Sequence, residues 1–153
     1  MKGAISIHEK RWRDYEMTVN GLPQEIRYNE ATVEGLFLPL LHRLTALQVE
    51  KGGRILAFLA APPATGKSTL LQFMEQLARE HGDLPQVQTL GMDGFHYPNA
   101  YLTSHTILQD GAEIPLKNIK GAPETFDVAH LAAKLAAAKE GATPFPVYDR
   151  RIH

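Results

Sequence analysis

The sequence contains no cysteine. This absence excludes disulfide bonds, thiolate catalysis and zinc sites built on cysteine. Long apolar segments are also missing, since the longest apolar stretch covers residues 55–64 and contains two prolines, whereas a membrane-spanning helix needs about 20 apolar residues. Residues 1–16 lack the apolar core of a signal peptide. We therefore expect a cytoplasmic protein with no membrane partner.

An excess of basic charge is equally absent. The formal net charge is −1 over 153 residues, so the composition does not favour a nucleic-acid partner. None of the seven histidines is spaced as a zinc motif, which argues against metal binding through histidine. The length and an apolar fraction of 44% are typical of one domain with a buried core. We expect residues 1–153 to form that single domain, with residues 1–30 as an N-terminal hairpin extension.

Turn residues and apolar spacing predict the elements of the first half. The Asn20-Gly21 pair favours a tight hairpin, because both residues accept positive φ. Apolar residues at helical spacing predict a helix over 33–47, in which Pro39 would cause a kink or a shifted start. A continuous apolar run over 54–60 predicts a buried strand, as in a parallel sheet.

The second half predicts two helices and two further strands. A helix is expected over 67–81, a strand over 87–92, mostly loop over 93–126, a helix capped by Asp127 and a short last strand over 143–149. This order indicates the α/β class, with three layers around a mainly parallel sheet. Sheets of this class more often have about five strands than three. We therefore expect the chain to be the front part of a longer protein, truncated at its C-terminus.

The stretch AAPPATGKST, residues 60–69, matches most of the Walker A pattern G-x-x-x-x-G-K-[ST]. In such a P-loop, backbone N–H groups at the start of a helix surround the phosphates, the lysine reaches the β- and γ-phosphates, and the next hydroxyl ligates Mg²⁺. The predicted nucleotide-binding residues are Ala64, Thr65, Gly66, Lys67, Ser68 and Thr69, with Ser68 as the magnesium ligand.

Two features of this loop depart from the pattern. Ala61 replaces the first glycine and adds a Cβ where the chain turns tightly. Pro62 and Pro63 have no N–H, although the donors that face phosphate come mainly from Ala64 onward. The alternative is a plain helix start, since G-K-[ST] occurs by chance in about one chain of this size in ten. The apolar run before the loop and the amphipathic helix after it favour the nucleotide site.

A second motif, GMDGFHYPNAYL, follows the predicted second strand. Asp93 would lie at the carboxyl end of that strand, where parallel sheets bind ligands. A carboxylate there can accept the proton of an attacking hydroxyl or help to position Mg²⁺. The alternative is an ordinary turn, because Asp-Gly is a common turn dipeptide. Asp93 and Lys67 are the candidate catalytic residues, and His96 is a candidate contact of the acceptor.

Together the motifs resemble the P-loop kinases grouped as phosphoribulokinase, uridine kinase and bacterial pantothenate kinase. MDGFHYPN resembles the DGF…PN segment of pantothenate kinases, IKGAPETFD their K-G-x-P-E-S-[YF]-D stretch, and PFPVYDRRIH their P-V-Y segment. The stretches come in family order at about the family spacing, so the resemblance covers residues 54–153. Within the superfamily the chain is most similar to a nucleoside- or sugar-kinase-like bacterial branch. The resemblance implies a three-layer P-loop NTPase fold that uses ATP and Mg²⁺.

The resemblance also carries roles to individual residues. It implies that Lys67 and Ser68 act in the phosphate loop and that Asp93 is the catalytic base. Tyr148 and His153 fall where uridine kinases place a Tyr and a His against the nucleobase. These positions are therefore candidate contacts of the acceptor.

Two positions depart from the family patterns. Arg150 stands where pantothenate kinases have a histidine, and Gly121 stands where uridine kinases have an aspartate for the ribose. The resemblance therefore supports phosphotransfer without naming the acceptor. Arg150 is itself a candidate substrate contact, because it would lie at the carboxyl end of the last predicted strand.

The leading functional hypothesis is an ATP-dependent phosphotransferase that acts on a hydroxyl of a small molecule, namely a sugar, a nucleoside or a pantothenate-like compound. The alternatives are a nucleotide-binding ATPase and a catalytically incomplete kinase fragment. A guanine-specific N-K-x-D stretch is absent, which argues against a GTPase. The sequence leaves open whether the protein forms a homodimer.

Overall fold

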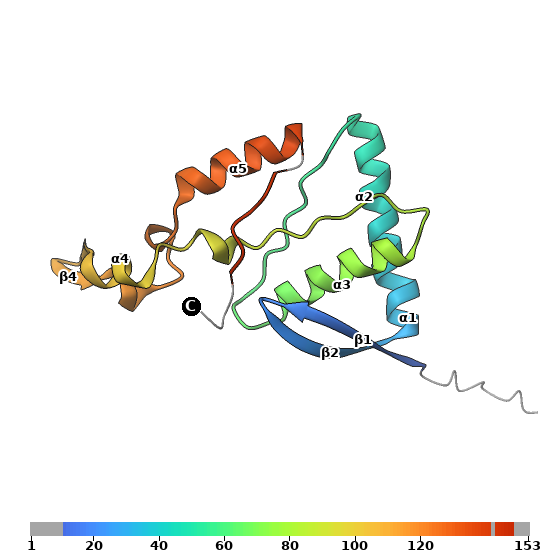
Figure 1. Cartoon of the computed structure of the whole chain (residues 1–153), viewed down its shortest axis with the longest axis horizontal. Helices are drawn as coiled ribbons and strands as arrows, with labels where there is room; N and C mark the ends of the chain where they lie inside the picture. Colours follow the sequence, from blue (N-terminus) through green and yellow to red (C-terminus); the bar gives the residue numbers. More distant parts are fainter. Residues whose placement is uncertain (1–10, 142, 149–153) are drawn as a thin grey trace, which may run out of the picture. The chain divides into compact units, whose positions relative to one another are not determined.

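The computed structural model of the protein describes residues 11–141 and 143–148 (Figure 1). The chain divides into two compact units, Met1–Thr89 and Leu90–His153. Among the helices in the described ranges, none is long and apolar enough to cross a bilayer.

The first unit begins with a β-hairpin at the place where the Asn20-Gly21 turn predicts it. Asn20 (φ 50°) and Gly21 (φ 80°) both have left-handed backbone conformations, which match the twist of the two strands. The strands pair antiparallel, with Tyr15 opposite Ile26. The elements of this unit are β1 (Trp12–Val19), β2 (Leu22–Asn29), α1 (Glu30–Thr32), the π-helical η1 (Val33–Phe37), α2 (Leu38–Lys51) and α3 (Lys67–Glu80).

The helical segment after the hairpin begins and ends at residues with clear capping roles. The Asn29 side chain accepts a hydrogen bond from the Ala31 N–H at 2.9 Å, which satisfies one of the free donors at a helix start. Pro39 lies in the first turn of α2, inside a helical run that begins at Glu30, and it has no N–H to donate to the preceding turn. The start of the helical run is not shifted to Pro39, because residues 30–51 are all helical. The irregularity near Pro39 is the π-helical turn η1 that precedes it. Gly52 (φ 67°) ends α2 in a left-handed conformation.

Phe73 of α3 lies at the centre of the core of the first unit. It is 0% exposed, and its ring centroid lies 4.8 Å from that of Tyr15, 4.2 Å from that of Tyr28 and 5.4 Å from that of Phe37. These three rings come from β1, β2 and η1, so one side chain of α3 contacts three other elements. Burial raises the pKa of Tyr15 and of Tyr28. Figure 1 shows the hairpin lying along α3.

Residues 54–60 do not form the buried strand that their apolar run predicts. They carry no strand assignment, and Phe58 is 77% exposed. A parallel strand needs neighbouring strands to accept and donate its backbone hydrogen bonds. The sheets found in the described residues are two separate antiparallel hairpins. Residues 54–60 therefore have the apolar composition of a buried strand, but they pair with no other strand among the described residues.

The second unit contains a hairpin within a segment predicted as loop. Strands β3 and β4 pair antiparallel around Asp110 (φ 52°) and Gly111 (φ 81°), the same turn chemistry as in the first hairpin. The Asp127 side chain accepts a hydrogen bond from the His130 N–H at 2.9 Å and so caps α5, as predicted. The elements are η2 (Met92–Phe95), α4 (Asn99–Ser104), β3 (Thr106–Gln109), β4 (Ala112–Pro115), η3 (Leu116–Ile119), η4 (Pro123–Thr125) and α5 (Val128–Glu140).

The two other predicted strands are likewise not assigned as strands. Residues 87–91 and 143–148 are irregular, and Met92 begins the 3-10 helix η2. Val147 is 83% exposed, so the apolar composition of its segment is not matched by burial. The three-layer fold with a mainly parallel sheet therefore stays a prediction.

We predict that Phe73→Ala lowers the free energy of unfolding by about 3–5 kcal/mol, because it leaves a cavity among three rings. Val49→Ala is the control, since it shortens an apolar side chain that is 76% exposed on α2 and should change stability by less than about 0.5 kcal/mol. Trp12, the one tryptophan in the sequence, lies in β1, so its fluorescence during denaturant unfolding follows the first unit. Equal losses for the two variants would contradict the assignment of Phe73 to the core.

Candidate functional site

The loop before α3 has a backbone conformation suited to an anion. Ala64 (φ 61°) and Gly66 (φ 86°) both lie in the left-handed region, and turns of this kind make successive N–H groups converge on a concavity. The Leu70 N–H bonds the Gly66 carbonyl at 2.9 Å and closes the first turn of α3. The N–H groups that lead a helix have no acceptor within it, and they carry the positive end of the helix dipole. The start of α3 therefore offers donors and a favourable field to a phosphate.

Lys67 lies folded over this loop. Its Nζ donates hydrogen bonds to the carbonyl oxygens of Ala61 at 2.8 Å and Pro62 at 2.7 Å. The Thr65 hydroxyl donates to the same Pro62 oxygen at 2.8 Å. These three bonds join the two ends of the loop. Pro62 has no N–H to offer, but its carbonyl is the common acceptor that closes the loop.

The residues predicted to bind the nucleotide, 64–69, all lie in this loop or in the first turn of α3. The Ser68 side chain is exposed, so its hydroxyl is accessible to a ligand. Within the described ranges, no group of three or more His, Cys, Asp or Glu could hold a metal ion. Mg²⁺ in nucleotide sites typically takes few protein oxygens and completes its shell with phosphates and water. A single hydroxyl such as that of Ser68 therefore fits a magnesium ion bound together with a nucleotide.

Thr69 connects this turn to the hairpin. Its hydroxyl donates a hydrogen bond to Oε1 of Gln24 on β2 at 3.3 Å. Sequence reasoning missed Gln24, because 45 positions separate the two residues and only the register of the hairpin brings them together.

Asp93 lies in the second unit, in the first turn of the 3-10 helix η2. The prediction that Asp93 ends a strand is therefore wrong, because Asp93 and Gly94 lie within a 3-10 helical turn that begins at Met92. Its backbone carbonyl accepts a hydrogen bond from the His96 N–H at 3.2 Å, and its side chain is half-buried. The catalytic role of its carboxylate stays a prediction.

Two of the three family-like stretches pair through their backbones. The Tyr97 N–H bonds the Thr125 carbonyl at 3.0 Å, and the Asp127 N–H bonds the Phe95 carbonyl at 2.8 Å. Thr125 is 0% exposed, and its hydroxyl donates to the Ala122 carbonyl at 2.7 Å, so this buried polar group is satisfied. The DGFHYPN and KGAPETFD stretches therefore lie side by side and are joined by backbone hydrogen bonds.

The third stretch packs against the first. A Cβ added at Gly94 would lie 2.1 Å from the backbone oxygen of Pro146, so only glycine fits there. Phe95 is buried, and its ring centroid lies 5.5 Å from that of Phe145. The glycine of the DGF segment is thus required by the close approach of the PFPVY segment.

The predicted acceptor contacts fall in different places. His96 stacks on Phe126 with ring centroids 3.7 Å apart, and its Nδ1 lies 3.2 Å from the Thr125 carbonyl oxygen. These contacts give His96 a structural role in joining the two stretches. Tyr148 is half-buried in the second unit. Arg150 and His153 lie outside the described residues.

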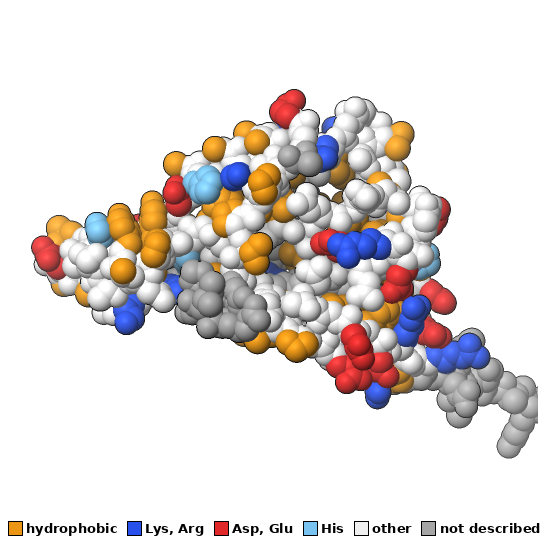
Figure 2. Space-filling view, viewed as in Figure 1, with side chains coloured by type: hydrophobic (Ala, Val, Ile, Leu, Met, Phe, Trp, Pro, Cys, Tyr) orange, Lys and Arg blue, Asp and Glu red, His pale blue; other side chains and the backbone are white. Residues whose placement is uncertain are grey.

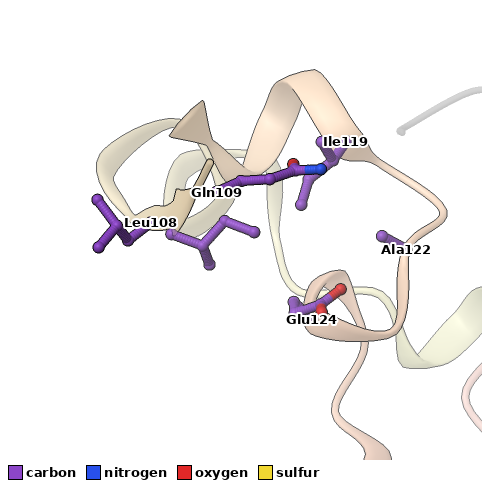
Figure 3. Close-up of a pocket in the computed structure, with 6 residues that line it drawn as sticks. Leu108, Gln109, Ile119, Ala122 and Glu124 are labelled. Atoms are coloured by element: carbon purple, nitrogen blue, oxygen red, sulfur yellow. The ribbon is translucent and has the colours of Figure 1, made fainter. Parts of the chain in front are cut away.

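A cavity of about 430 Å³ lies beside these stretches in the second unit. Figure 3 shows Gln109 of the β3–β4 hairpin extending toward Ile119, with Ala122 and Glu124 of η4 on the facing segment. Glu124 is next in sequence to Thr125, which contacts His96. The lining residues are Ile107, Leu108, Gln109, Ile119, Ala122 and Glu124. Sequence reasoning missed this cavity, although the Asp110-Gly111 pair carried the signal for the hairpin that forms one wall.

Comparisons with known proteins relate the chain to kinase-like proteins. It is 48% identical over 139 residues to the uncharacterized protein YggC of Escherichia coli, a match that covers 90% of this chain and 55% of YggC. It is 31% identical over 155 residues to the pantothenate kinase of Sorangium cellulosum, with 90% of this chain and 47% of that kinase covered. It is 36% identical over 83 residues to the pantothenate kinase of Rhizobium rhizogenes, with 54% and 22% covered.

The remaining comparisons gave no match. No family model matches the chain, and no solved structure matches it. The chain spans about half the length, or less, of the curated relatives that it matches. The similarity to proteins named pantothenate kinase therefore indicates a kinase-like family.

We predict that Gly94→Ala destabilises the second unit by about 1–3 kcal/mol, the usual cost of overpacking. The reason is the 2.1 Å approach of an added Cβ to the Pro146 oxygen. Gly91→Ala is the control, because an added Cβ there meets no atom within 4 Å and φ is −89°. Thermal unfolding of both variants measures the difference. A loss at Gly94 no larger than at Gly91 would mean that the PFPVY segment does not close on the DGF segment.

Proposed function

We propose that this chain binds Mg-ATP through residues 64–69 and supplies the nucleotide-binding part of a phosphotransferase. The observation that carries the proposal is the loop itself, which has two left-handed residues, a helix start and Lys67 folded over it. The similarity to pantothenate kinases supports phosphotransfer as the reaction. The proposed acceptor is a hydroxyl of a small molecule, namely a sugar, a nucleoside or a pantothenate-like compound.

Lys67 would bind the β- and γ-phosphates of the nucleotide. Its ammonium now bonds two neutral carbonyl oxygens, those of Ala61 and Pro62. Hydrogen bonds between an ammonium and a phosphate oxygen are about twice as strong as those to neutral acceptors. A phosphate that enters the loop would therefore compete well for Lys67. Until then the two carbonyls keep the side chain close to the loop.

Ser68 would hold a magnesium ion that is bound together with the nucleotide. The magnesium ion supplies positive charge that offsets the charge developing on the transferred phosphoryl group. The N–H groups at the start of α3 would face the phosphates, with the helix dipole favouring their negative charge.

Asp93 would accept the proton of the attacking hydroxyl. Asp93 is half-buried in η2, and a carboxylate is a suitable general base for a hydroxyl that is losing its proton in the transition state.

We also propose that residues 54–60, 87–92 and 143–148 belong to the parallel sheet of a three-layer P-loop fold. Phe58 is 77% exposed and Val147 is 83% exposed. Strands of parallel sheets are covered on both faces and are therefore apolar throughout. Apolar side chains exposed to this degree in two of the three segments support this assignment, because a parallel sheet with covered faces would bury them.

We predict that Lys67→Met weakens Mg-ATP binding by about 10- to 100-fold, the value of a lost hydrogen bond to a charged group. Lys51→Met is the matched control, since Lys51 lies exposed in the last turn of α2. Isothermal titration calorimetry measures both affinities, and circular dichroism checks that both variants fold. Binding of Mg-ATP by Lys67→Met as tightly as by the unaltered chain would refute the assigned site. ATP consumption that no hydroxyl compound changes would favour the alternative of an ATPase.

We predict that Asp93→Asn lowers kcat by about 10²- to 10⁴-fold, the usual contribution of a general base, and leaves Mg-ATP affinity nearly unchanged. The assay uses the acceptor that a panel of sugars, nucleosides and vitamins identifies. Asp110→Asn is the control, because asparagine also accepts the positive φ found at that turn. Parallel losses of affinity and of magnesium dependence would make Asp93 a metal ligand, and an unchanged kcat would remove it from the mechanism.

A further inference from the structure

The inner face of the β1–β2 hairpin combines apolar side chains with two polar ones. The register places Tyr15 opposite Ile26 and Met17 opposite Gln24. Tyr15 is buried against Phe73, and side chains alternate between the faces of a strand. Gln24 therefore shares the inner face with Tyr15, as does Arg13. The outer face carries charged residues, which gather over the hairpin in Figure 2.

Both polar residues of the inner face contact α3, one near each end of the helix. Nη2 of Arg13 lies 3.2 Å from Oε2 of Glu80, the last residue of α3. Gln24 accepts the hydrogen bond of the Thr69 hydroxyl in the first turn of α3. Phe73 packs between these two contacts. The hairpin thus contacts α3 near both ends of the helix. The contact of Gln24 with Thr69 is the one next to the proposed phosphate-binding loop.

We propose that Gln24 is a positioning residue for this loop, an inference that rests on the proposed nucleotide site. Thr69 follows Lys67 by two residues, so a bond that fixes Thr69 also fixes the turn that carries Lys67 and Ser68. The loop residues 61–66 are exposed and have little packing of their own to order them. Ordering this turn before the nucleotide arrives lowers the entropy cost of binding. Gln24 therefore raises nucleotide affinity without touching the nucleotide.

The test compares Mg-ATP affinities in a double-mutant cycle. Gln24→Ala should weaken binding by roughly 2- to 10-fold, the range of one neutral hydrogen bond, with an unchanged melting temperature because the pair is exposed. Thr69→Val should weaken binding as well, whereas Thr69→Ser keeps the hydroxyl and should restore it. The double variant should be no weaker than Thr69→Val alone, because both changes remove the same bond. Arg13→Met, which cuts the contact at the far end of α3, should leave the affinity unchanged.

Amide hydrogen exchange in the free chain provides the second readout. Gln24→Ala should speed exchange at Leu70, whose N–H closes the first turn of α3, and Arg13→Met should not. Additive effects of Gln24→Ala and Thr69→Val, or equal losses of affinity for Arg13→Met and Gln24→Ala, would overturn the proposal. If the unaltered chain itself does not bind Mg-ATP, the proposed function fails, and the Leu70 exchange rate still decides whether Gln24 orders this turn. An unchanged rate at Leu70 would then refute that role as well.

Discussion

Phe73 packs against Tyr15, Tyr28 and Phe37, and this contact fixes α3 within the first unit. The hairpin and the helical segment after it both depend on that ring, because each places an aromatic side chain against it. The N-terminus of α3 carries Gly66, Lys67 and the residues that follow. Packing of Phe73 in the core therefore determines where the loop places its N–H donors. The apolar face of α3 thus positions the proposed phosphate site at the N-terminus of the same helix. A helix on the surface without this anchor would not hold such a loop in one place.

In the second unit, the family-like stretches are joined mainly by backbone and packing contacts. Gly94 is required by the Pro146 oxygen, and Thr125 is a buried, satisfied hydroxyl. His96 is held by Thr125 and Phe126. Several residues of the family-like motifs, namely Gly94, His96 and Thr125, therefore have packing or hydrogen-bonding roles in the fold. Asp93 is half-buried in η2, and its role as the catalytic base stays a proposal.

Local signals in the sequence predicted local structure well. The Asn20-Gly21 turn, the start of α3 at Lys67 and the Asp127 cap all follow from the chemistry of one or two residues. The Asp110-Gly111 hairpin carried the same signal, and it was missed because the flanking strands are only four residues each. The strand expected over 54–60 depended on partners distant in sequence, which an apolar run cannot specify. Lys67 contacts two loop carbonyls, and Gln24 contacts Thr69. These contacts depend on where the folded chain places the side chains, so the spacing of residues in the sequence could not predict them.

The central claim is that the loop before α3 binds the phosphates of a nucleotide. The most direct measurement is a titration of the ¹⁵N-labelled chain with Mg-ATP, in which the backbone amide of each residue is followed by NMR. The account predicts that the largest shifts occur at residues 64–69, with a smaller change at Gln24 and none at the β3–β4 turn around Asp110. Shifts that leave residues 64–69 unaffected, or that appear only elsewhere in the chain, would contradict it.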